Sequence, residues 1–319
     1  MRFFVLIFTL MITSLAHAWE PTKPIDTSIG WSPGSGNDVS FRIVSAQVEK
    51  MTGARFVIHY RPGAGGAIAN SELVKAPADG HFIGIVSSSS LTATDKIFVP
   101  TKTWDIESFT QVIGYAGSTM AVFAHPDDPV NTIQEMSKVL KTEKIAVGDP
   151  GGASRITYEL LRDNVGFREA DDAVVHVTYK GNPETITGVI TKEIRFGASP
   201  LATVMEQAKA GKIKIIGITN PRPLADYPNI PAFPSVYPKM SYNLIWGITA
   251  PKGLSKEAIK WYEDAFTAAL NTEEVKAQLK ANNMIVDSRT LSSPKYTEYL
   301  LKQRKDLEPL VETIIKSQK

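Results

Sequence analysis

Five short segments of the 319-residue chain combine residue types that can bind an anion. Each follows a stretch with a strand-like pattern and is rich in glycine, serine, asparagine or proline: residues 33–38, 61–66, 87–90, 151–154 and 197–200. Glycine lets the backbone approach a ligand closely. Successive N–H groups at a helix start form a positive pocket, and serine hydroxyls donate further hydrogen bonds. These segments predict a site that holds a carboxylate without a dedicated arginine.

The alternative interpretation is that small polar residues simply make tight turns, for which backbone reasons are sufficient. This would be the preferred explanation for any one segment alone. Five segments at equivalent strand ends favour the binding interpretation. The run Ser87–Ser90 is the least expected as a plain turn, because glycine or asparagine would form a turn more easily.

Several larger side chains stand beside these segments, each with two interpretations. Trp31 ends the first strand and fits either the floor of a site or the core. Tyr179 ends a strand at the predicted cleft and is equally ambiguous. Arg155 could reach an anion or could be a solvated helix residue, whereas Trp246 is expected to pack where the chain passes between lobes.

Signals for catalysis, metals and cofactors are weak. The chain has no cysteine, no Gly-x-Ser-x-Gly elbow and no Walker loop. Ser292-Ser293-Pro294-Lys295 matches Ser-x-x-Lys but lies in a polar stretch, where a chance match is expected. The histidines of the mature chain lack metal-ligand spacing: His59, His81, His125 and His176. We expect no cofactor, no metal and no enzymatic activity; an enzyme would have to use Asp38 or Tyr179, for which no partner is visible.

The mature sequence alternates strand-like and helix-like stretches. Strands are predicted at residues 55–60, 81–86, 145–148, 174–179, 194–197 and 213–219, with helices between them. The continuous apolar run at 81–86 fits a strand buried on both faces of a parallel sheet. This alternation predicts an α/β fold with parallel sheets and right-handed crossovers. In such sheets ligands sit at the carboxyl ends of the strands, where the five segments lie.

Two further strand-like stretches predict that the chain crosses between two lobes. Residues 112–124 contain two strand-like segments around Gly117, and residues 243–250 form another after a proline-rich region. The tail from Ser255 is helical and is expected to fold back on the first lobe. We expect lobe 1 to contain residues 19–120 and 246–319 and lobe 2 residues 121–245, with the two crossover strands as a hinge.

The first eighteen residues have the pattern of a secretory signal. Arg2 precedes a short apolar run, and Ala16-His17-Ala18 is a small-x-small cleavage pattern, so the mature chain should begin at Trp19. The absence of cysteine excludes disulfides and lipid attachment at a cysteine, which fits a bacterial periplasm. The net charge is only +2, without a basic stripe for nucleic acid. We expect a free, monomeric periplasmic protein.

Several motifs resemble the Bug family, the periplasmic solute-binding proteins of tripartite tricarboxylate transporters (TTT systems). The most specific is Tyr60-Arg61-Pro62-Gly63-Ala64-Gly65-Gly66 followed by Ala76-Pro77-Ala78-Asp79-Gly80. Residues 33–38 resemble the family's first ligand loop, with Asp38 at its usual acid. Weaker matches are Tyr179-Lys180-Gly181, Lys209-Ala210-Gly211-Lys212 and the segment 228–235. The resemblance covers nearly the whole mature chain in order.

The resemblance implies a two-lobed, type II periplasmic binding protein fold with a deep interlobe cleft for carboxylated ligands. Together with Gly151 of the fourth segment, it gives these ligand-binding candidates: Trp31, Ser35, Asn37, Asp38, Ser87, Ser88, Ser89, Ser90, Gly151, Ser154, Tyr179, Ala198 and Ser199. Two residues depart from the family pattern. Arg195 stands where an acidic residue is usual, and Ser199 stands where aspartate is frequent.

These observations predict a receptor that captures a small mono-, di- or tricarboxylate or an aromatic acid and delivers it to TTT membrane subunits. Closure of the lobes would bury the ligand and create the surface that the membrane partner recognises. One alternative is an orphan sensor that presents its ligand to a signalling receptor. A more remote alternative is an enzyme built on a binding-protein fold.

Overall fold

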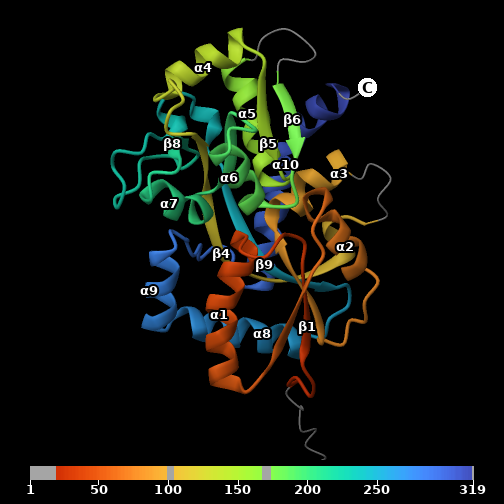
Figure 1. Cartoon of the computed structure of the whole chain (residues 1–319). Helices are drawn as coiled ribbons and strands as arrows, with labels where there is room; N and C mark the ends of the chain where they lie inside the picture. Colours follow the sequence, from red (N-terminus) through yellow and green to blue (C-terminus); the bar gives the residue numbers. More distant parts are fainter. Residues whose placement is uncertain (1–18, 99–103, 167–173, 318–319) are drawn as a thin grey trace, which may run out of the picture.

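The computed structural model describes residues 19–98, 104–166 and 174–317 (Figure 1). The expected signal segment lies outside these residues. The described chain forms two lobes that share one continuous mixed sheet, in the order β2-β1-β3-β9-β4-β7-β5-β6, with β8 paired to β4. Among the described helices, none is both long and apolar enough to span a bilayer.

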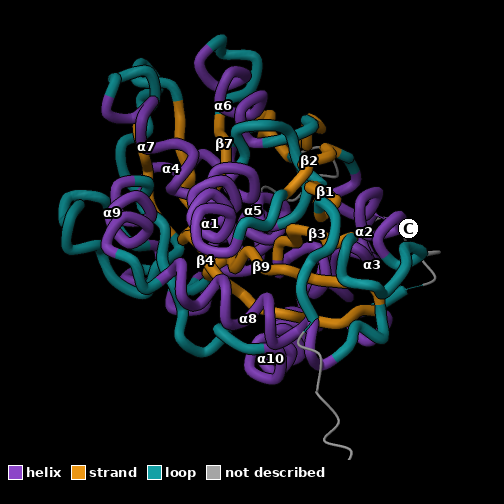
Figure 2. Tube along the Cα trace, turned by 90° about the horizontal axis from the view of Figure 1, so that it is seen from below, coloured by secondary structure: helices purple, strands orange, loops and turns teal. Residues whose placement is uncertain are grey.

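The first lobe contains one end of this sheet. Its strands are β1 (Ile25–Ile29), β2 (Phe56–Tyr60), β3 (Phe82–Ser87), β9 (Asn243–Pro251) and the first part of β4 (Phe109–Ala124). β1 pairs in parallel with β2 and β3, whereas β9 is antiparallel to both β3 and β4. Figure 2 shows these strands side by side in the order β2-β1-β3-β9-β4. The predicted parallel arrangement is confirmed for β1, β2 and β3.

Helices cover both faces of the first lobe. Phe41 of α1 (Gly36–Thr52) stacks on Phe266 of α8 (Lys256–Leu270) over one face. α2 (Ala67–Leu73) and the start of α10 (Ser293–Ser317) pack on the other face through Leu73 and Tyr296. α3 (Asp95–Phe98) follows a π-helical turn at Ser90–Thr94, and α9 (Glu273–Ala281) packs beside α1. The C-terminal helices therefore pack on the first lobe, and α10 also contacts α5 (Ala153–Val165) of the second lobe.

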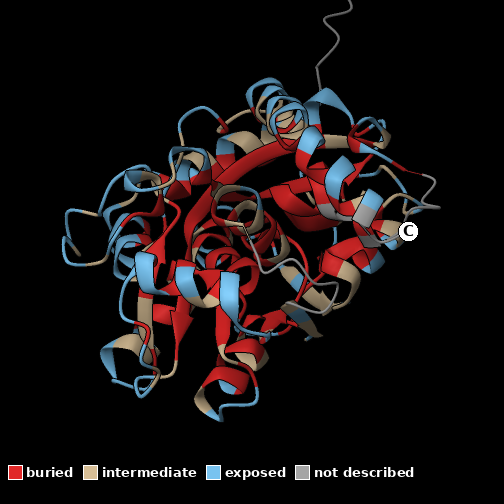
Figure 3. Cartoon of the chain, turned by 90° about the horizontal axis from the view of Figure 1, so that it is seen from above, coloured by how far each residue is buried: buried red, intermediate tan, exposed pale blue. Residues whose placement is uncertain are grey.

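The second lobe contains the other end of the sheet. Its strands are the second part of β4 with β5 (Ile145–Asp149), β6 (Val174–Thr178), β7 (Phe196–Pro200) and β8 (Lys214–Ile218). β5 is parallel to β6 and β7, and β4 is antiparallel to β7 and β8. α4 (Ile133–Thr142) and α5 (Ala153–Val165) cover one face; α6 (Asn182–Ile190) and α7 (Leu201–Lys209) cover the other. Figure 3 shows the strands buried beneath helices with exposed outer faces.

The two crossover strands differ in one respect from expectation. β9 matches the predicted crossing strand at residues 243–250 closely. Residues 112–124, expected as two strand-like segments, belong instead to the single sixteen-residue strand β4. Its first part pairs with β9, and its second part pairs with β7 and β8 on either side. Pairing along its whole length keeps β4 continuous, with register shifts between Gln111 and Ile113 and between Gly114 and Ala116.

Candidate functional site

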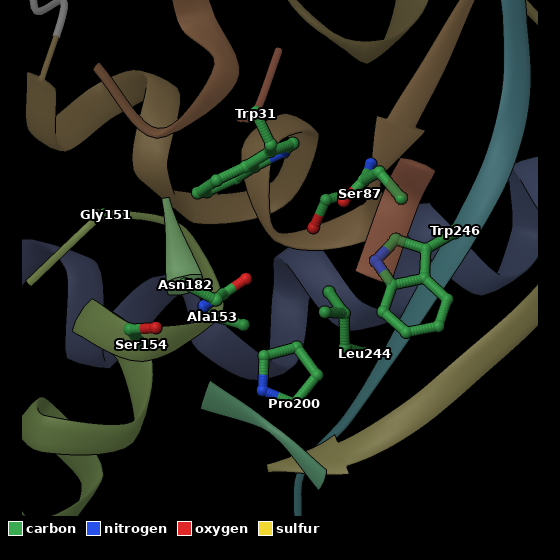
Figure 4. Close-up of a pocket in the computed structure, with 10 residues that line it drawn as sticks. Trp31, Ser87, Gly151, Ala153, Ser154, Asn182, Pro200, Leu244 and Trp246 are labelled. Atoms are coloured by element: carbon green, nitrogen blue, oxygen red, sulfur yellow. The ribbon is translucent and has the colours of Figure 1, made fainter. Parts of the chain in front are cut away.

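A narrow cavity lies where the loops of the two lobes meet (Figure 4). The space enclosed at its centre is about 10 Å³, room for about one water molecule. The lining residues are Trp31, Asn37, Ser87, Gly151, Ala153, Ser154, Asn182, Pro200, Leu244 and Trp246.

Helix starts from both lobes form much of this lining. The first turns of α1, α5 and α6 contribute Asn37, Ser154 and Asn182, and Pro200 immediately precedes α7. The first N–H groups of a helix have no partner inside it, and the helix dipole places partial positive charge there. The cavity is therefore lined by hydrogen-bond donors that favour an anionic or carbonyl acceptor.

Three of these helix starts lack the caps found elsewhere. The residues that precede α1, α5 and α6 make no side-chain hydrogen bond to the first turn, whereas the Ala202 N–H of α7 donates to Ser118 Oγ at 3.3 Å. Away from the cavity, the side chains of Thr132, Ser255 and Thr272 cap α4, α8 and α9. α2 also begins without a side-chain cap, but none of its residues lines the cavity. The first N–H groups of α1, α5 and α6 are thus left open to a bound acceptor.

The serine run after β3 is mostly occupied with its own turn. Ser87 Oγ lies 2.6 Å from Ser89 Oγ, and Ser90 Oγ donates to the Ser87 carbonyl at 2.9 Å. Ser88 Oγ accepts a hydrogen bond from the backbone N–H of Ile245 at 3.3 Å, which ties the turn to β9. Only Ser87 lines the cavity, so Ser88, Ser89 and Ser90 position it rather than face the cavity themselves.

Asp38 stabilises the loop at residues 33–38, which leads into α1. Its Oδ2 accepts from the backbone N–H of Gly34 at 2.9 Å, and its Oδ1 accepts from Arg42 and Tyr60 at 2.8 Å each. Burial raises the pKa of Tyr60 and the Asp38 carboxylate adds to this, so Tyr60 keeps its proton. With both carboxylate oxygens engaged and no place in the cavity lining, Asp38 shapes the loop that carries Asn37. Asn37 in turn donates to the Ile85 carbonyl at 3.2 Å.

Trp31 connects the two lobes across the cavity. Its side chain is buried and lies so close to Gly152 that a β-carbon there would be 2.5 Å from Trp31 Cη2. Beside it, Ser32 Oγ of the first lobe donates to Glu184 Oε1 of the second at 2.8 Å. The structure therefore represents a closed arrangement in which the loops of the two lobes touch.

A buried ionic network holds the loop before α5. Asp149 accepts from the Gly151 N–H at 2.8 Å, and Arg155 Nη1 and His176 Nδ1 lie 3.0 and 3.1 Å from its Oδ2. Burial opposes ionisation, but His176 and Arg155 outweigh it and hold the pKa of Asp149 below its ordinary value. Arg155 also donates to Glu159 at 2.7 Å. Arg155 is thus neither a ligand arginine nor a solvated one, because it points to internal carboxylates.

Ala198 and Ser199 require a correction, because they were expected in a loop. β7 extends to Pro200, since Ala198 and Ser199 pair with Val122 and Ala121 of β4. Both are fully buried, and neither lines the cavity. The Ala198 carbonyl accepts from Ser154 Oγ at 2.6 Å, and Ser199 Oγ accepts from Asn182 Nδ2 at 3.1 Å. They fix the orientation of two side chains that do line the cavity.

Ser35 precedes α1 and is buried, but it is not among the lining residues. Tyr179 lies further away. Its hydroxyl packs over α6, where a β-carbon on Gly188 would come within 2.5 Å. Burial, with the neighbouring Glu193 carboxylate, raises the pKa of Tyr179 to about 12. Of the predicted candidates, the cavity brings together Trp31, Asn37, Ser87, Gly151 and Ser154.

The lining includes residues that were not among the sequence-based candidates: Ala153, Asn182, Pro200, Leu244 and Trp246. Asn182 could have been predicted as a candidate from the sequence, because it stands in a Gly-Asn-Pro sequence at a helix start. Leu244 carried none, since an apolar residue in a strand usually indicates core. Trp246 was assigned only a packing role.

Arg195 and possible metal ligands lie outside this site. Arg195 pairs with Asp128 at 2.8 Å and Glu143 at 2.6 Å beside a separate surface hollow of the second lobe. Its departure from the family pattern therefore does not alter the cavity lining. Over the residues that the structure describes, no group of histidine and acidic side chains is arranged to hold a metal ion.

Comparison with known proteins agrees with this architecture. The family model described as "Tripartite tricarboxylate transporter family receptor" (TctC) matches residues 40–315. MatC from Rhodopseudomonas palustris with bound malate is similar at a TM-score of 0.85, with 17% identity over 92% of this chain and all of the other. An R. palustris protein with adipate has a TM-score of 0.84, with 19% identity over 92% of this chain and 98% of the other.

The periplasmic binding protein BugD has a TM-score of 0.84, with 20% identity over 94% of this chain and 99% of the other. These likenesses confirm the predicted two-lobed periplasmic binding protein fold. Because the family model spans most of the chain, the protein belongs to the TctC family of tripartite tricarboxylate transporter receptors, the solute-binding proteins among which the Bug proteins are found.

Proposed function

We propose that this protein binds a small carboxylate in the interlobe cavity and delivers it to the membrane subunits of a TTT system. The observation that carries this proposal is that the starts of α1, α5 and α6 lie at the cavity without a side-chain cap from the preceding residue. A carboxylate carries negative charge and several acceptor lone pairs, which match these N–H groups and the positive ends of the helix dipoles.

Structures of the same fold support a small ligand. Two structures of the same fold contain malate and adipate, which are short carboxylates. Polar contacts would come from both lobes, with backbone N–H groups supported by Ser87, Ser154 and Asn182.

Closure of the lobes would retain the ligand. The contact of Trp31 with Gly152 and the Ser32–Glu184 hydrogen bond both join the lobes at the mouth of the cavity. A ligand would enter when these contacts separate and would be buried when they form. The closed surface would then signal occupancy to the membrane subunits.

The cellular setting follows from the sequence and the family. We propose that residues 1–18 direct export, that cleavage follows Ala18, and that the mature protein acts as a periplasmic monomer. Mass spectrometry of the protein purified from the periplasmic fraction tests this directly. A measured mass that does not match a chain beginning at Trp19 would contradict the proposed cleavage site.

The ligand class can be tested by calorimetry on protein that has been unfolded, dialysed and refolded to remove bound solute. The screen includes mono-, di- and tricarboxylates of two to six carbons, together with neutral amides of matching length. We expect at least one carboxylate to bind with a dissociation constant in the micromolar range or tighter, and its amide not to bind. Absence of binding by every carboxylate would contradict the proposed function.

A further inference from the structure

Trp246 lies on β9 and forms one wall of the cavity. Its side chain is fully buried, and it is a lining residue. In Figure 4 its ring nitrogen faces the cavity, opposite Ser154 and Asn182. The ring is held tightly, because a β-carbon on Gly36 would lie 2.2 Å from Trp246 Cζ2. Only glycine at position 36 leaves room for the ring in this position.

The indole N–H of Trp246 has no hydrogen-bond partner within residues 19–98, 104–166 and 174–317. Other tryptophans have acceptors for the same group: Trp104 Nε1 donates to Ser71 Oγ at 3.1 Å and Trp19 Nε1 to the Asp79 carbonyl at 3.2 Å. Buried donors are nearly always satisfied, because leaving one unpaired costs free energy. An unpaired donor that faces a cavity points to an acceptor supplied by the occupant.

The same wall contains a second set of donors. The Cζ2, Cη2 and Cε2 atoms of Trp246 lie nearest to Gly36, the first residue of α1, and Nε1 is bonded to Cε2. This helix start has no side-chain cap, and the hydroxyl of the preceding Ser35 is also buried without a partner among the described residues. The indole N–H and the first turn of α1 therefore form one donor cluster. The starts of α5 and α6 form another across the cavity.

We propose that Trp246 is a ligand-binding residue that selects small aliphatic dicarboxylates over monocarboxylates of the same length. This inference rests on the proposed function and adds to it a residue and a substrate class. One carboxylate binds at the starts of α5 and α6, which carry Ser154 and Asn182. The other accepts the N–H of Trp246 beside the start of α1. A monocarboxylate fills the first position and leaves Trp246 unpaired.

The test compares matched probes on matched variants. The probes are butanedioate with butanoate and hexanedioate with hexanoate, titrated by calorimetry into the refolded full mature chain. Trp246→Phe removes the N–H and keeps an aromatic ring. Trp104→Phe is the control, because it removes the indole N–H of another buried tryptophan, which is bonded to Ser71 outside the cavity.

We expect the wild-type protein to bind at least one dicarboxylate more tightly than its monocarboxylate partner. Trp246→Phe should weaken that dicarboxylate by about 10- to 100-fold, the usual effect of losing a hydrogen bond to a charged group. Its effect on the monocarboxylate should be less than about threefold, since the N–H is unused there. Trp104→Phe should change neither affinity.

Equal weakening of both probes by Trp246→Phe would overturn the inference and leave the proposed function intact, because the ring would then only shape the cavity. A wild-type preference for the monocarboxylates would do the same. If no carboxylate binds to the wild-type protein, both the proposed function and the inference fail.

A second measurement uses the wild-type protein and so does not depend on the folding of Trp246→Phe. In protein with ¹⁵N-labelled indoles, each of the five tryptophans gives one N–H signal. Single Trp→Phe changes at the other four positions assign the signal of Trp246 by elimination. The dicarboxylate should shift this signal and slow its exchange with water, whereas the monocarboxylate should not slow it. An unprotected signal with the dicarboxylate bound would overturn the inference.

Discussion

Trp31 of the first lobe covers Gly152 of the second so closely that any side chain at position 152 would overlap the indole. Gly152 has a φ of 61° and directly precedes α5, so the backbone also favours glycine there. The contact exists only when the lobes are together. It therefore links one glycine to closure of the protein.

Gly152→Ala should hinder closure and weaken binding of the best carboxylate from the screen by about tenfold or more, because overpacking costs roughly 1–3 kcal/mol. Calorimetry gives the affinity, and X-ray scattering shows whether saturating ligand still compacts the protein. The control is Gly211→Ala, which has a similar φ of 69° but open space around it. Equal losses in both variants would indicate backbone strain rather than the Trp31 contact.

The hydrogen bond from Ser32 to Glu184 should contribute to closure. We expect Ser32→Ala to weaken ligand binding by about five- to tenfold, the effect of roughly 1 kcal/mol from one hydrogen bond. The same substitution in a Glu184→Ala background should cost almost nothing further. Additive losses in this double-mutant cycle would show that the two residues act independently.

Asp149 should make folding stability depend on acid pH. A carboxyl whose pKa is lowered on folding stabilises the protein above its unfolded pKa, and this contribution is lost as the pH falls through the folded value. Because the pKa of Asp149 lies below its ordinary 3.8, the loss should begin below about pH 4. Asp149→Asn should lower the free energy of unfolding at pH 7 by about 3 kcal/mol, because Arg155 loses a buried partner. Urea unfolding from pH 7 to pH 2 measures both effects.

The control for this prediction is Asp264→Asn, which removes an exposed ion pair with Lys260. Exposed pairs contribute little to stability, so this variant should keep the wild-type dependence on pH. If Asp149→Asn followed the same acid curve as the wild-type protein, another carboxyl would have to be responsible.

Ser199 should influence the ligand through Asn182. Ser199→Ala removes the acceptor of the Asn182 amide, and we expect binding to weaken by about three- to tenfold, since one neutral hydrogen bond contributes about 1 kcal/mol. Ser235→Ala removes a hydroxyl that donates to the Ala232 carbonyl away from the cavity and should leave affinity unchanged. An unchanged affinity in Ser199→Ala would show that Asn182 holds its orientation without this contact.

The sequence predicted the alternating elements well because their signals are local. Apolar runs and glycine turns located β3, β5 and β6 within one or two residues. The end of β7 was missed because Ala198 and Ser199 owe their extended conformation to pairing with β4, far away in the sequence. The single strand β4 was divided for the same reason: its continuity depends on partners in both lobes.

The site was predicted at the level of loops rather than side chains. The cavity lies at strand ends and helix starts, where Ser87, Gly151 and Ser154 line it, and ligand binding by these residues stays a prediction. The direction of a charged side chain depends on tertiary partners, so the inward pairing of Asp38 and Arg155 had no local signal. Leu244 and Trp246 reach the cavity because β9 crosses beneath it, which periodicity alone does not reveal.

Thr119 of β4 pairs with Asn243 of β9, where the chain leaves the first lobe and returns to it. Strands β5 to β8 and helices α4 to α7 all lie between these two residues in the sequence. Because synthesis proceeds from the N-terminus, all residues of the second lobe are made before β9. The first lobe also needs β9, α8 and α10, which lie within residues 243–317, so it is completed last. A chain stopped before β9 would therefore keep a foldable second lobe and expose the edge of β3, making premature termination or C-terminal clipping a route to aggregation.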